Sequence, residues 1–223
     1  MRIVTFGATG MVGTRLVSEA SGRGHEVVAA SRGNAGSGGR NAGYGGASGE
    51  AGAGAISTVA VDARDQSRVA DLLRTADVAI SAVRPRPGEE ASVPEATRAL
   101  LDAAAETQTA LLLIGGAGPL ISALAPATLV LDDERFVPAQ WRSSAVASLV
   151  QLRVCEGHGA AWTYLSPPAV LEPGIRTGTY RRGTTTLLLD AAGRSRISAE
   201  DLAVAALDEV EHPGEARHFT VAY

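Results

Sequence analysis

Three glycines that follow a short apolar strand near the start of the chain constrain its fold most. The segment 2–6, RIVTF, reads as a strand, and Gly7, Gly10 and Gly13 come directly after it. A helix predicted over 11–24 opens within this run. Glycines at this spacing allow a tight turn, close approach of an anion to the backbone and close packing of the helix on a sheet. Because a helix N-terminus binds anions, we expect the pyrophosphate of a dinucleotide here.

Apolar strands and amphipathic helices alternate along most of the remaining chain. Strands are predicted over 26–31, 56–61, 77–83, 110–116 and 160–166, and helices over 67–76, 91–107 and 138–155. This alternation predicts an α/β fold with a doubly wound, Rossmann-like parallel sheet. The last part is less regular, with strands expected at 185–190 and 218–223 around a helix at 198–213. We expect one domain over 1–223, in which 168–223 forms a small lobe on the substrate side.

The segment 33–54 interrupts this pattern between the second and third strands. It holds ten glycines in 22 residues and few side chains that can pack. Connections at such a place usually have about two to six residues. We expect a flexible surface insertion. The alternative is a lid that orders over a bound ligand through Arg40 or Tyr44.

Composition and charge narrow the classes of function. The 223 residues suffice for one sizeable core, and the net charge of -4 argues against nucleic acid as a partner. No apolar stretch reaches the ~20 residues that span a bilayer, and the first residues lack the pattern of a signal peptide. Cys155 is the single cysteine, and no metal-ligand spacing is present. We expect a cytoplasmic monomer or homodimer that acts on a small molecule, without metal, membrane or nucleic acid.

The end of the second strand indicates which dinucleotide binds. NAD-binding proteins place an acidic residue there, which holds the ribose 2′-hydroxyl. This chain has Ser31 and Arg32 instead. A guanidinium pairs with a 2′-phosphate, so NADP(H) is favoured over NAD(H). The alternative is that Arg32 is a solvated loop residue. Asp62, after the third strand, is expected either beside the adenine or as the cap of the following helix.

The segment 7–13, GATGMVG, resembles the glycine motif of the short-chain dehydrogenase/reductase superfamily in its atypical and extended branches. Later segments narrow the resemblance to small NmrA-like and biliverdin-reductase-B-like NAD(P)H-binding proteins. They are LIGGAGPL (113–120), FVPAQW (136–141), the segment 161–181, SRISAEDLAVAALDEVE (195–211) and HFTVAY (218–223). The similarity covers nearly the whole chain outside the glycine-rich segment.

The cofactor-binding residues are expected at the carboxyl ends of the strands, where open α/β sheets place their ligands. The adenosine and pyrophosphate are expected at Gly7, Thr9, Gly10, Met11, Val12, Gly13, Ser31, Arg32 and Asp62. The resemblance implies that the ribose lies along Ser81, Ala82 and Val83. It also implies that Gly115 and Gly116 lie near the nicotinamide and that Pro167 passes its carboxamide.

Catalytic members of the superfamily use a Tyr-x-x-x-Lys pair, in which the tyrosine is the general acid. The pair is absent from the helix expected to carry it, because Trp141 stands near the tyrosine position and Ala145 lies four residues on. Trp141, Arg142 and Tyr164 are the catalytic candidates that remain, with Trp141 as an aromatic wall of the site. Tyr164 alternates with Trp162 on a strand, which favours a core position. Arg142 either clamps an acidic substrate or faces water.

Three functions are compatible with this sequence. The first is an NADPH-dependent reductase that transfers hydride to a small flat conjugated or carbonyl substrate, with positioning rather than a protein acid supplying most of the catalysis. The second is a non-catalytic NADP(H)-binding sensor or regulatory protein. The third is an NADP-dependent epimerase or dehydratase, which the missing Tyr-x-x-x-Lys pair disfavours. We favour the reductase, because no segment of the sequence reads as an output for a sensor.

Overall fold

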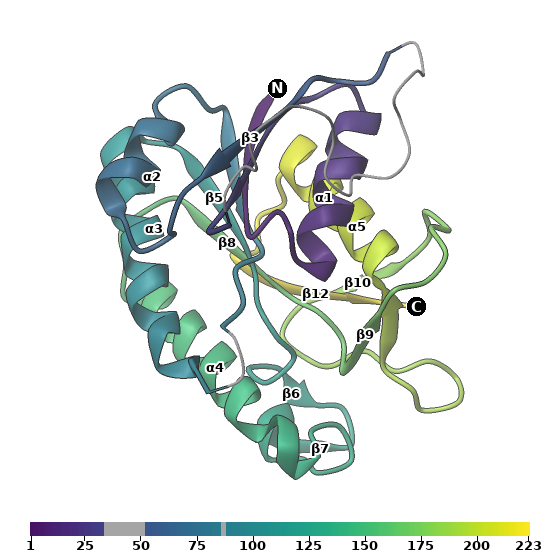
Figure 1. The fold of residues 1–223 in the computed structure, drawn as a ribbon. Coiled ribbons are helices and arrows are strands. Elements are labelled where there is room, and N and C mark those ends of the chain that lie inside the picture. Colours follow the sequence, from purple (N-terminus) through teal and green to yellow (C-terminus); the bar gives the residue numbers. More distant parts are fainter. Residues whose placement is uncertain (34–51, 86–87) are drawn as a thin grey trace.

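An eight-stranded sheet lies at the centre of the computed structural model, which describes residues 1–33, 52–85 and 88–223 (Figure 1). The strand order is β10-β12-β8-β5-β4-β1-β2-β3, and every neighbouring pair is parallel except β10 with β12. The strands are β1 (Arg2–Phe6), β2 (Glu26–Ser31), β3 (Ile56–Ala60), β4 (Val78–Ser81), β5 (Ala110–Ile114), β8 (Trp162–Ser166), β10 (Arg181–Gly183) and β12 (His218–Ala222). The doubly wound, Rossmann-like α/β fold predicted from the sequence is confirmed.

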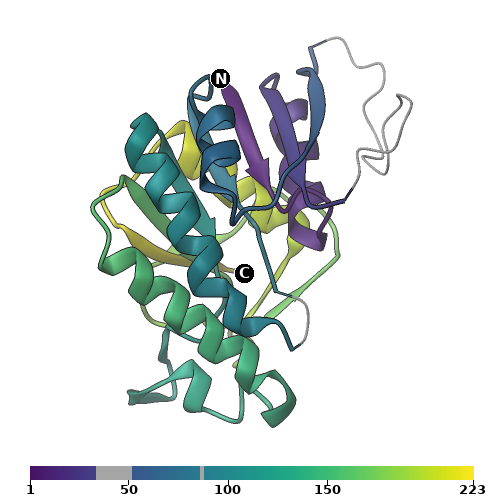
Figure 2. The same cartoon turned by 60° about the vertical axis from the view of Figure 1, so that its left-hand side comes forward.

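Helices cover both faces of the sheet, as Figures 1 and 2 show. On one face lie α1 (Met11–Gly22) and α5 (Ala199–Glu211), and on the other lie α2 (Gln66–Leu73), α3 (Val93–Thr107) and α4 (Arg142–Glu156). Each helix layer encloses its own cluster of buried apolar side chains. In β1, Ile3 belongs to the cluster under α1 and α5, whereas Val4 belongs to the cluster on the opposite face. Strands buried on both faces need apolar residues at successive positions, which explains the continuous apolar runs of the sequence.

A smaller lobe packs beside the start of α4. In it, β6 (Ile121–Ser122) pairs with β7 (Ala125–Leu129), and 3-10 turns span Val130–Asp132 and Ala139–Trp141. Leu120, Leu131 and Leu187 lie buried in a third apolar cluster within this lobe. The lobe therefore has a core of its own, separate from the two clusters of the sheet.

The strand predicted over 185–190 is wrong. Leu187 is 2% exposed and packs into the apolar cluster of the small lobe. The apolar residues of this run are therefore explained by burial in that cluster and not by a strand. Thr186 forms only an isolated bridge with Ile121. The strand that extends the main sheet in this region is β10, which pairs along β12.

The strands that follow β8 belong to two different sheets. β9 (Val170–Glu172) and β11 (Arg196–Ser198) form a separate parallel pair, while β10 and β12 join the edge of the main sheet. Most of the predicted glycine-rich insertion, residues 34–51, lies outside the described residues. Within 1–33, 52–85 and 88–223, no helix has the length and apolar character needed to cross a membrane.

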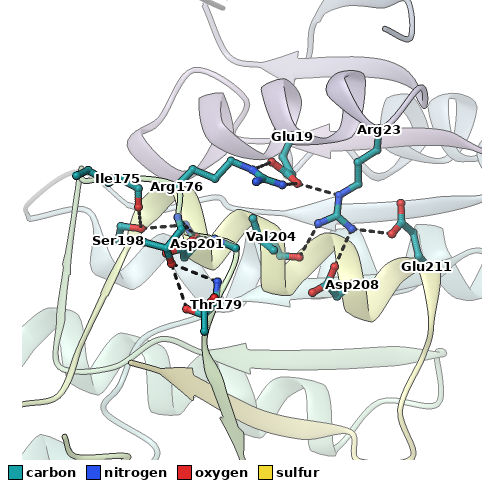
Figure 3. A network of polar contacts seen from close by, with 12 residues as sticks. Glu19, Arg23, Ile175, Arg176, Thr179, Ser198, Asp201, Val204, Asp208 and Glu211 are labelled. Atoms are coloured by element: carbon teal, nitrogen blue, oxygen red, sulfur yellow. Dashed lines mark hydrogen bonds and ion pairs between the residues drawn. The ribbon is translucent and has the colours of Figure 1, made fainter. Parts of the chain in front are cut away.

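A chain of ion pairs ties α1 to α5 and to the segment that follows β9 (Figure 3). Arg23, the C-cap residue of α1, donates to Glu19, Asp208 and Glu211 at 2.6–2.8 Å. Arg176 donates two hydrogen bonds to Glu19, at 2.7 and 2.8 Å. Glu19 is therefore shared between two guanidinium groups, one from α1 and one from the segment after β9.

The start of α5 holds the same segment from the other side. Ser198 caps α5 by accepting the Asp201 backbone N–H, and its hydroxyl donates to the Ile175 carbonyl. The Asp201 carboxylate accepts backbone N–H groups from Thr177 and Gly178, each at 2.8 Å. Charged acceptors at a helix N-terminus are favourable, and here they also fix the chain between β9 and β10.

This network predicts a pH-dependent contribution of Glu19 to stability. Burial opposes ionisation of Glu19, but hydrogen bonds from Arg176 and Arg23 outweigh burial and lower its pKa below the ordinary 4.5. A lowered folded-state pKa stabilises the protein above the ordinary value, and that stabilisation is lost as the pH falls through the folded-state pKa. Glu19→Gln is expected to lower the free energy of unfolding by about 1–3 kcal/mol at neutral pH. Urea denaturation at several pH values measures the difference from wild type.

The difference between wild type and Glu19→Gln is expected to shrink as the pH falls below 4.5. Glu156→Gln on the exposed side of α4 is the matched control and should leave stability nearly unchanged. A cost of Glu19→Gln that stays constant with pH would contradict the assignment.

Candidate functional site

A cleft of about 500 Å³ lies at the carboxyl ends of the parallel strands. It opens around β1, whose neighbours in the sheet are β2 on one side and β4 on the other. The helix after β1 packs on one face of the sheet and the helix before β4 packs on the other, so the connections diverge at this point. Such a switch point is where open α/β sheets bind their ligands.

The glycines of the first turn have different roles. Gly7 has a positive φ of 75°, and a Cβ there would lie 2.6 Å from the Ala82 carbonyl oxygen. A Cβ at Gly13 would lie 2.1 Å from the Gly7 carbonyl oxygen, so only glycine allows α1 to pack on the turn. At Gly10 the nearest such contact is 3.3 Å. Gly7 and Gly13 are therefore required by the fold, whereas Gly10 leaves space on the cleft side.

The N-terminus of α1 points its free backbone donors to this cleft. Gly10 is the N-cap and makes no side-chain capping bond, and the first turn carries no acidic residue. Gly10, Met11 and Val12 all line the cleft, together with Thr9 of the preceding turn. An anion seated here would meet unpaired N–H groups and the positive end of the helix dipole.

The ends of β2 and β3 bring two arginines to the cleft. Arg32, beside Ser31, lies 3.7 Å from Glu89. Arg64 pairs with Asp62 at 2.7 Å. Hydrogen bonds from Arg64 lower the pKa of Asp62 to about 2, against a smaller opposing effect of burial. Ser31, Arg32, Asp62 and Arg64 line the cleft, whereas Glu89 does not. The lining at this end therefore has two guanidinium groups and one carboxylate.

The inner end of the cleft is mostly apolar. It runs along β4, α3 and the end of β5. Its lining comprises Ser81, Ala82, Val83, Val93, Ala96, Thr97, Leu100, Ile114, Gly115 and Leu171, together with the polar side chains Arg84 and Gln151. Ser81 is 1% exposed, and its hydroxyl has no hydrogen-bond partner among the described residues. An orphaned hydroxyl in the wall of a cleft is a ready contact for a polar ligand.

Three of the residues predicted to bind cofactor do not line the cleft. Gly13 lies behind the turn, where its role is packing. Gly116 faces Ser148 of α4, and Pro167 is buried after β8. The other predicted cofactor residues, which are Gly7, Thr9, Gly10, Met11, Val12, Ser31, Arg32, Asp62, Ser81, Ala82, Val83 and Gly115, are brought together in its lining.

The three catalytic candidates also lie outside the lining. Trp141 is 61% exposed at the end of a 3-10 turn, so it is not a wall of this cleft. Arg142 pairs with Asp132 at 2.6 Å and donates to the Leu131 carbonyl, which holds it in the small lobe. Sequence position alone suggested these roles, but the 3-10 turn carries both side chains away from the ends of the strands.

Tyr164 is fully buried beneath the cleft. Its hydroxyl lies 2.9 Å from the Ser148 carbonyl oxygen, to which it donates, and 3.1 Å from Oε1 of Gln151. Burial raises the pKa of Tyr164, which makes its phenol a poor proton donor. A Cβ at Gly115 would lie 1.9 Å from this hydroxyl, so Gly115 is needed for the tyrosine to pack below it. The core position favoured from the strand alternation agrees with this placement.

Sequence reasoning missed five polar residues that line the cleft: Arg64, Arg84, Ser92, Thr97 and Gln151. The first two had a signal, because each follows a predicted strand end by only a few residues. Gln151 had none, because its position on α4 faces the cleft only through the packing of α4 on α3.

Comparison with known proteins yields a family and several relatives. A family model described as NAD(P)H-binding matches residues 7–213. The uncharacterized protein YwnB of Bacillus subtilis is 33% identical over 217 residues, which cover 96% of this chain and 93% of YwnB. A structure from Burkholderia pseudomallei, described as a proposed exported protein, is 34% identical with a TM-score of 0.83, and all of both chains is covered.

Two further structures carry names that bear on function. A proposed epimerase from Bacteroides thetaiotaomicron is 30% identical, with a TM-score of 0.83 and coverage of 100% of this chain and 96% of that one. A proposed NADH-flavin reductase from Streptococcus pneumoniae is 26% identical, with a TM-score of 0.80 and coverage of 100% and 99%.

The different roles of Gly10 and Gly13 predict opposite outcomes for two alanine variants. Gly10→Ala is expected to keep the melting temperature close to wild type and to weaken NADPH binding by about tenfold or more, because the new methyl group occupies the approach to the N–H donors. Gly13→Ala is expected to cost about 1–3 kcal/mol of stability, because its Cβ collides with the backbone of Gly7. Thermal denaturation and nicotinamide fluorescence measure the two effects. A Gly10→Ala protein with unchanged NADPH affinity would contradict this role of the turn.

Proposed function

This chain belongs to the NAD(P)H-binding protein family, and on that basis we propose that it is an NADPH-dependent reductase that transfers hydride to a small flat conjugated or carbonyl acceptor. The NAD(P)H-binding family predicted from the glycine motif is confirmed over residues 7–213, and membership of the short-chain dehydrogenase/reductase superfamily is part of this proposal. The observation that carries the proposal is the cleft itself: an anion-binding turn, a cationic end and an apolar inner end lie in one line along the strand ends.

The cationic end favours NADPH over NADH. Arg32 and Arg64 stand at the ends of neighbouring strands, where the 2′-position of the adenosine ribose would lie. Two guanidinium groups can share a phosphate, and the absence of a carboxylate at the end of β2 removes the group that would repel it. Glu89, at 3.7 Å from Arg32, is exposed enough to move aside when the phosphate binds.

The residues present fit the cofactor at two further places. Gly10 leaves the space that a pyrophosphate needs, and the unpartnered Ser81 hydroxyl is available to the ribose. When bound, NADPH supplies a hydride from its nicotinamide ring. The protein's part is to hold that ring at the apolar inner end, near Gly115, with room for a flat acceptor against it.

The proton of the reaction has no protein donor of the usual kind. The chain contains no lysine, so the lysine of a Tyr-x-x-x-Lys pair is missing from the whole sequence. Tyr164 is buried, and its hydroxyl already donates to a backbone carbonyl. We propose that the acceptor takes its proton from water, as flavins and quinones can, while positioning and exclusion of bulk water accelerate the hydride step.

The named relatives include both an epimerase and a reductase, and the missing lysine–tyrosine pair is what favours the reductase here. The Streptococcus pneumoniae protein carries the name of a flavin reductase, a reaction that needs no lysine–tyrosine pair. The same lack of an acid–base pair favours one alternative, a non-catalytic NADP(H)-binding sensor. We further propose that the protein acts on a small molecule in the cytoplasm, as a monomer or homodimer, without nucleic acid or membrane partners.

Cofactor choice is tested by equilibrium binding. Wild type is expected to bind NADPH about ten- to a hundredfold more tightly than NADH, because charge-assisted contacts to the 2′-phosphate favour the phosphorylated cofactor. Arg32→Ala and Arg64→Ala should each reduce this ratio, and the double variant should abolish it. Arg68→Ala, on the exposed side of α2, is the matched control. Equal affinity of wild type for both cofactors in calorimetry would overturn the assignment.

Turnover is tested by NADPH oxidation, followed through the nicotinamide absorbance, against flavins, quinones and aromatic ketones. Tyr164→Phe is expected to keep the turnover number within a few-fold of wild type while lowering stability by about 1 kcal/mol through the lost hydrogen bond. Loss of a general acid typically costs about a hundredfold or more, so a drop of that size would show that Tyr164 is the proton donor. NADPH binding without oxidation by any acceptor would favour the sensor.

A further inference from the structure

The cleft holds a third arginine whose charge is not neutralised by its surroundings. Arg84 lies three residues after the end of β4 and lines the cleft. The other two arginines of the lining have acidic neighbours, since Arg32 lies 3.7 Å from Glu89 and Arg64 lies 2.7 Å from Asp62. Arg84 makes no hydrogen bond or ion pair with any residue in 1–33, 52–85 or 88–223. A guanidinium keeps its charge at any physiological pH, so the cleft presents an uncompensated cation at this point.

Arg84 lies toward the inner end of the cleft rather than the adenosine end. Its charge acts on the phenol of Tyr164, opposing the rise in the tyrosine pKa that burial causes. Tyr164 packs directly below Gly115 at the end of β5. The Arg84 residue is exposed to solvent in this wall of the cleft, so a ligand can reach its guanidinium.

A second polar side chain meets the cleft at the same place. Gln151 of α4 is 6% exposed, lines the cleft and lies 3.1 Å from the Tyr164 hydroxyl. One of its two amide atoms is engaged by the tyrosine, and the other is left for a ligand. Arg84, from the segment after β4, and Gln151, from α4, thus both line the cleft in the region of Tyr164.

We propose that Arg84 binds an anionic group of the acceptor, a carboxylate or a phosphate, and that Gln151 hydrogen-bonds its neutral polar part. The inference rests on the proposed function and adds the substrate class to it. The charges of the cofactor find their partners elsewhere: the pyrophosphate at the N-terminus of α1 and the 2′-phosphate at Arg32 and Arg64. Arg84 is then the cation left for the second ligand, in a chain whose net charge of -4 gives anions no general attraction.

Matched acceptors test the proposal. Flavin mononucleotide and riboflavin share the same ring system and differ by a phosphate; benzoylformate and its methyl ester differ by a carboxylate charge. Wild type is expected to show a kcat/KM for one or both anionic members about tenfold or more above that of the neutral partner. Arg84→Gln should remove this preference while leaving the neutral acceptors unchanged, and Arg84→Lys should restore part of it. The pair that responds identifies the anion as phosphate or carboxylate.

A cofactor role for Arg84 is separated from a substrate role by the NADPH dissociation constant. Arg84→Gln should leave that constant within about twofold of wild type, and Arg153→Gln on the exposed side of α4 should change nothing. If Arg84→Gln weakens NADPH binding and slows all acceptors alike, Arg84 is a cofactor ligand and the proposal fails. Equal use of the charged and neutral members of both pairs by wild type would also overturn it.

Binding measurements keep the two proposals distinguishable. If no acceptor is reduced, the reductase fails, but quenching of flavin fluorescence still reports binding to the NADP-saturated protein. Tighter binding of flavin mononucleotide than of riboflavin, lost in Arg84→Gln, would then support an anion site in a protein without turnover. Equal binding of the two flavins, together with equal competition by benzoylformate and its ester, would overturn the anion site.

Discussion

The contact between Gly13 and the carbonyl of Gly7 is the constraint on which the rest of the structure depends. A Cβ at Gly13 would stand 2.1 Å from that oxygen. The first helix can pack against the sheet only because residue 13 is a glycine and has no Cβ. With α1 seated there, its N-terminus lies over the end of β1, and Gly10 faces the cleft. The position of the anion-binding turn is thus a consequence of helix–sheet packing, and the same glycines serve the core on one side and the ligand on the other.

Charge is distributed unevenly between the cleft and the rest of the molecule. The face formed by α1 and α5 uses its arginines in closed ion pairs, such as those of Arg23 with Glu19, Asp208 and Glu211. The pair of Arg176 with Glu19 holds the segment after β9, and Leu171 of β9 in turn lines the cleft. In the cleft, guanidinium groups outnumber carboxylates. An acidic protein therefore concentrates positive potential where two anionic ligands would meet, which raises local affinity without making the whole surface basic.

The fold was predictable because its signals are local. The glycine run and the alternation of strands and helices specify a parallel sheet with the ligand site at the ends of its strands, and the first turn follows from that rule. The residues from Ser81 to Val83 came from the family resemblance. The run at 185–190 misled because an apolar segment buried in a small cluster has the same composition as a strand. Trp141 misled because its place in sequence matched that of a tyrosine, whereas a 3-10 turn carries it into solvent. Gln151 was not predictable, since only the packing of α4 on its neighbours decides which of its side chains reach the cleft.

Tyr164 shows how this cleft departs from acid catalysis. In the superfamily pattern a tyrosine on the helix above the cleft donates a proton to the substrate. Here that helix is α4, which presents Gln151 to the cleft, and the nearby tyrosine comes from β8 and lies below the floor. Its hydroxyl is bonded to the Ser148 carbonyl of α4, so it joins the helix to the sheet. Burial raises the pKa of Tyr164. Proton donation from this position would therefore leave a phenolate without solvation, which is energetically costly. Under the proposed function, the cleft therefore suits hydride transfer to acceptors whose reduced form is stable until water protonates it.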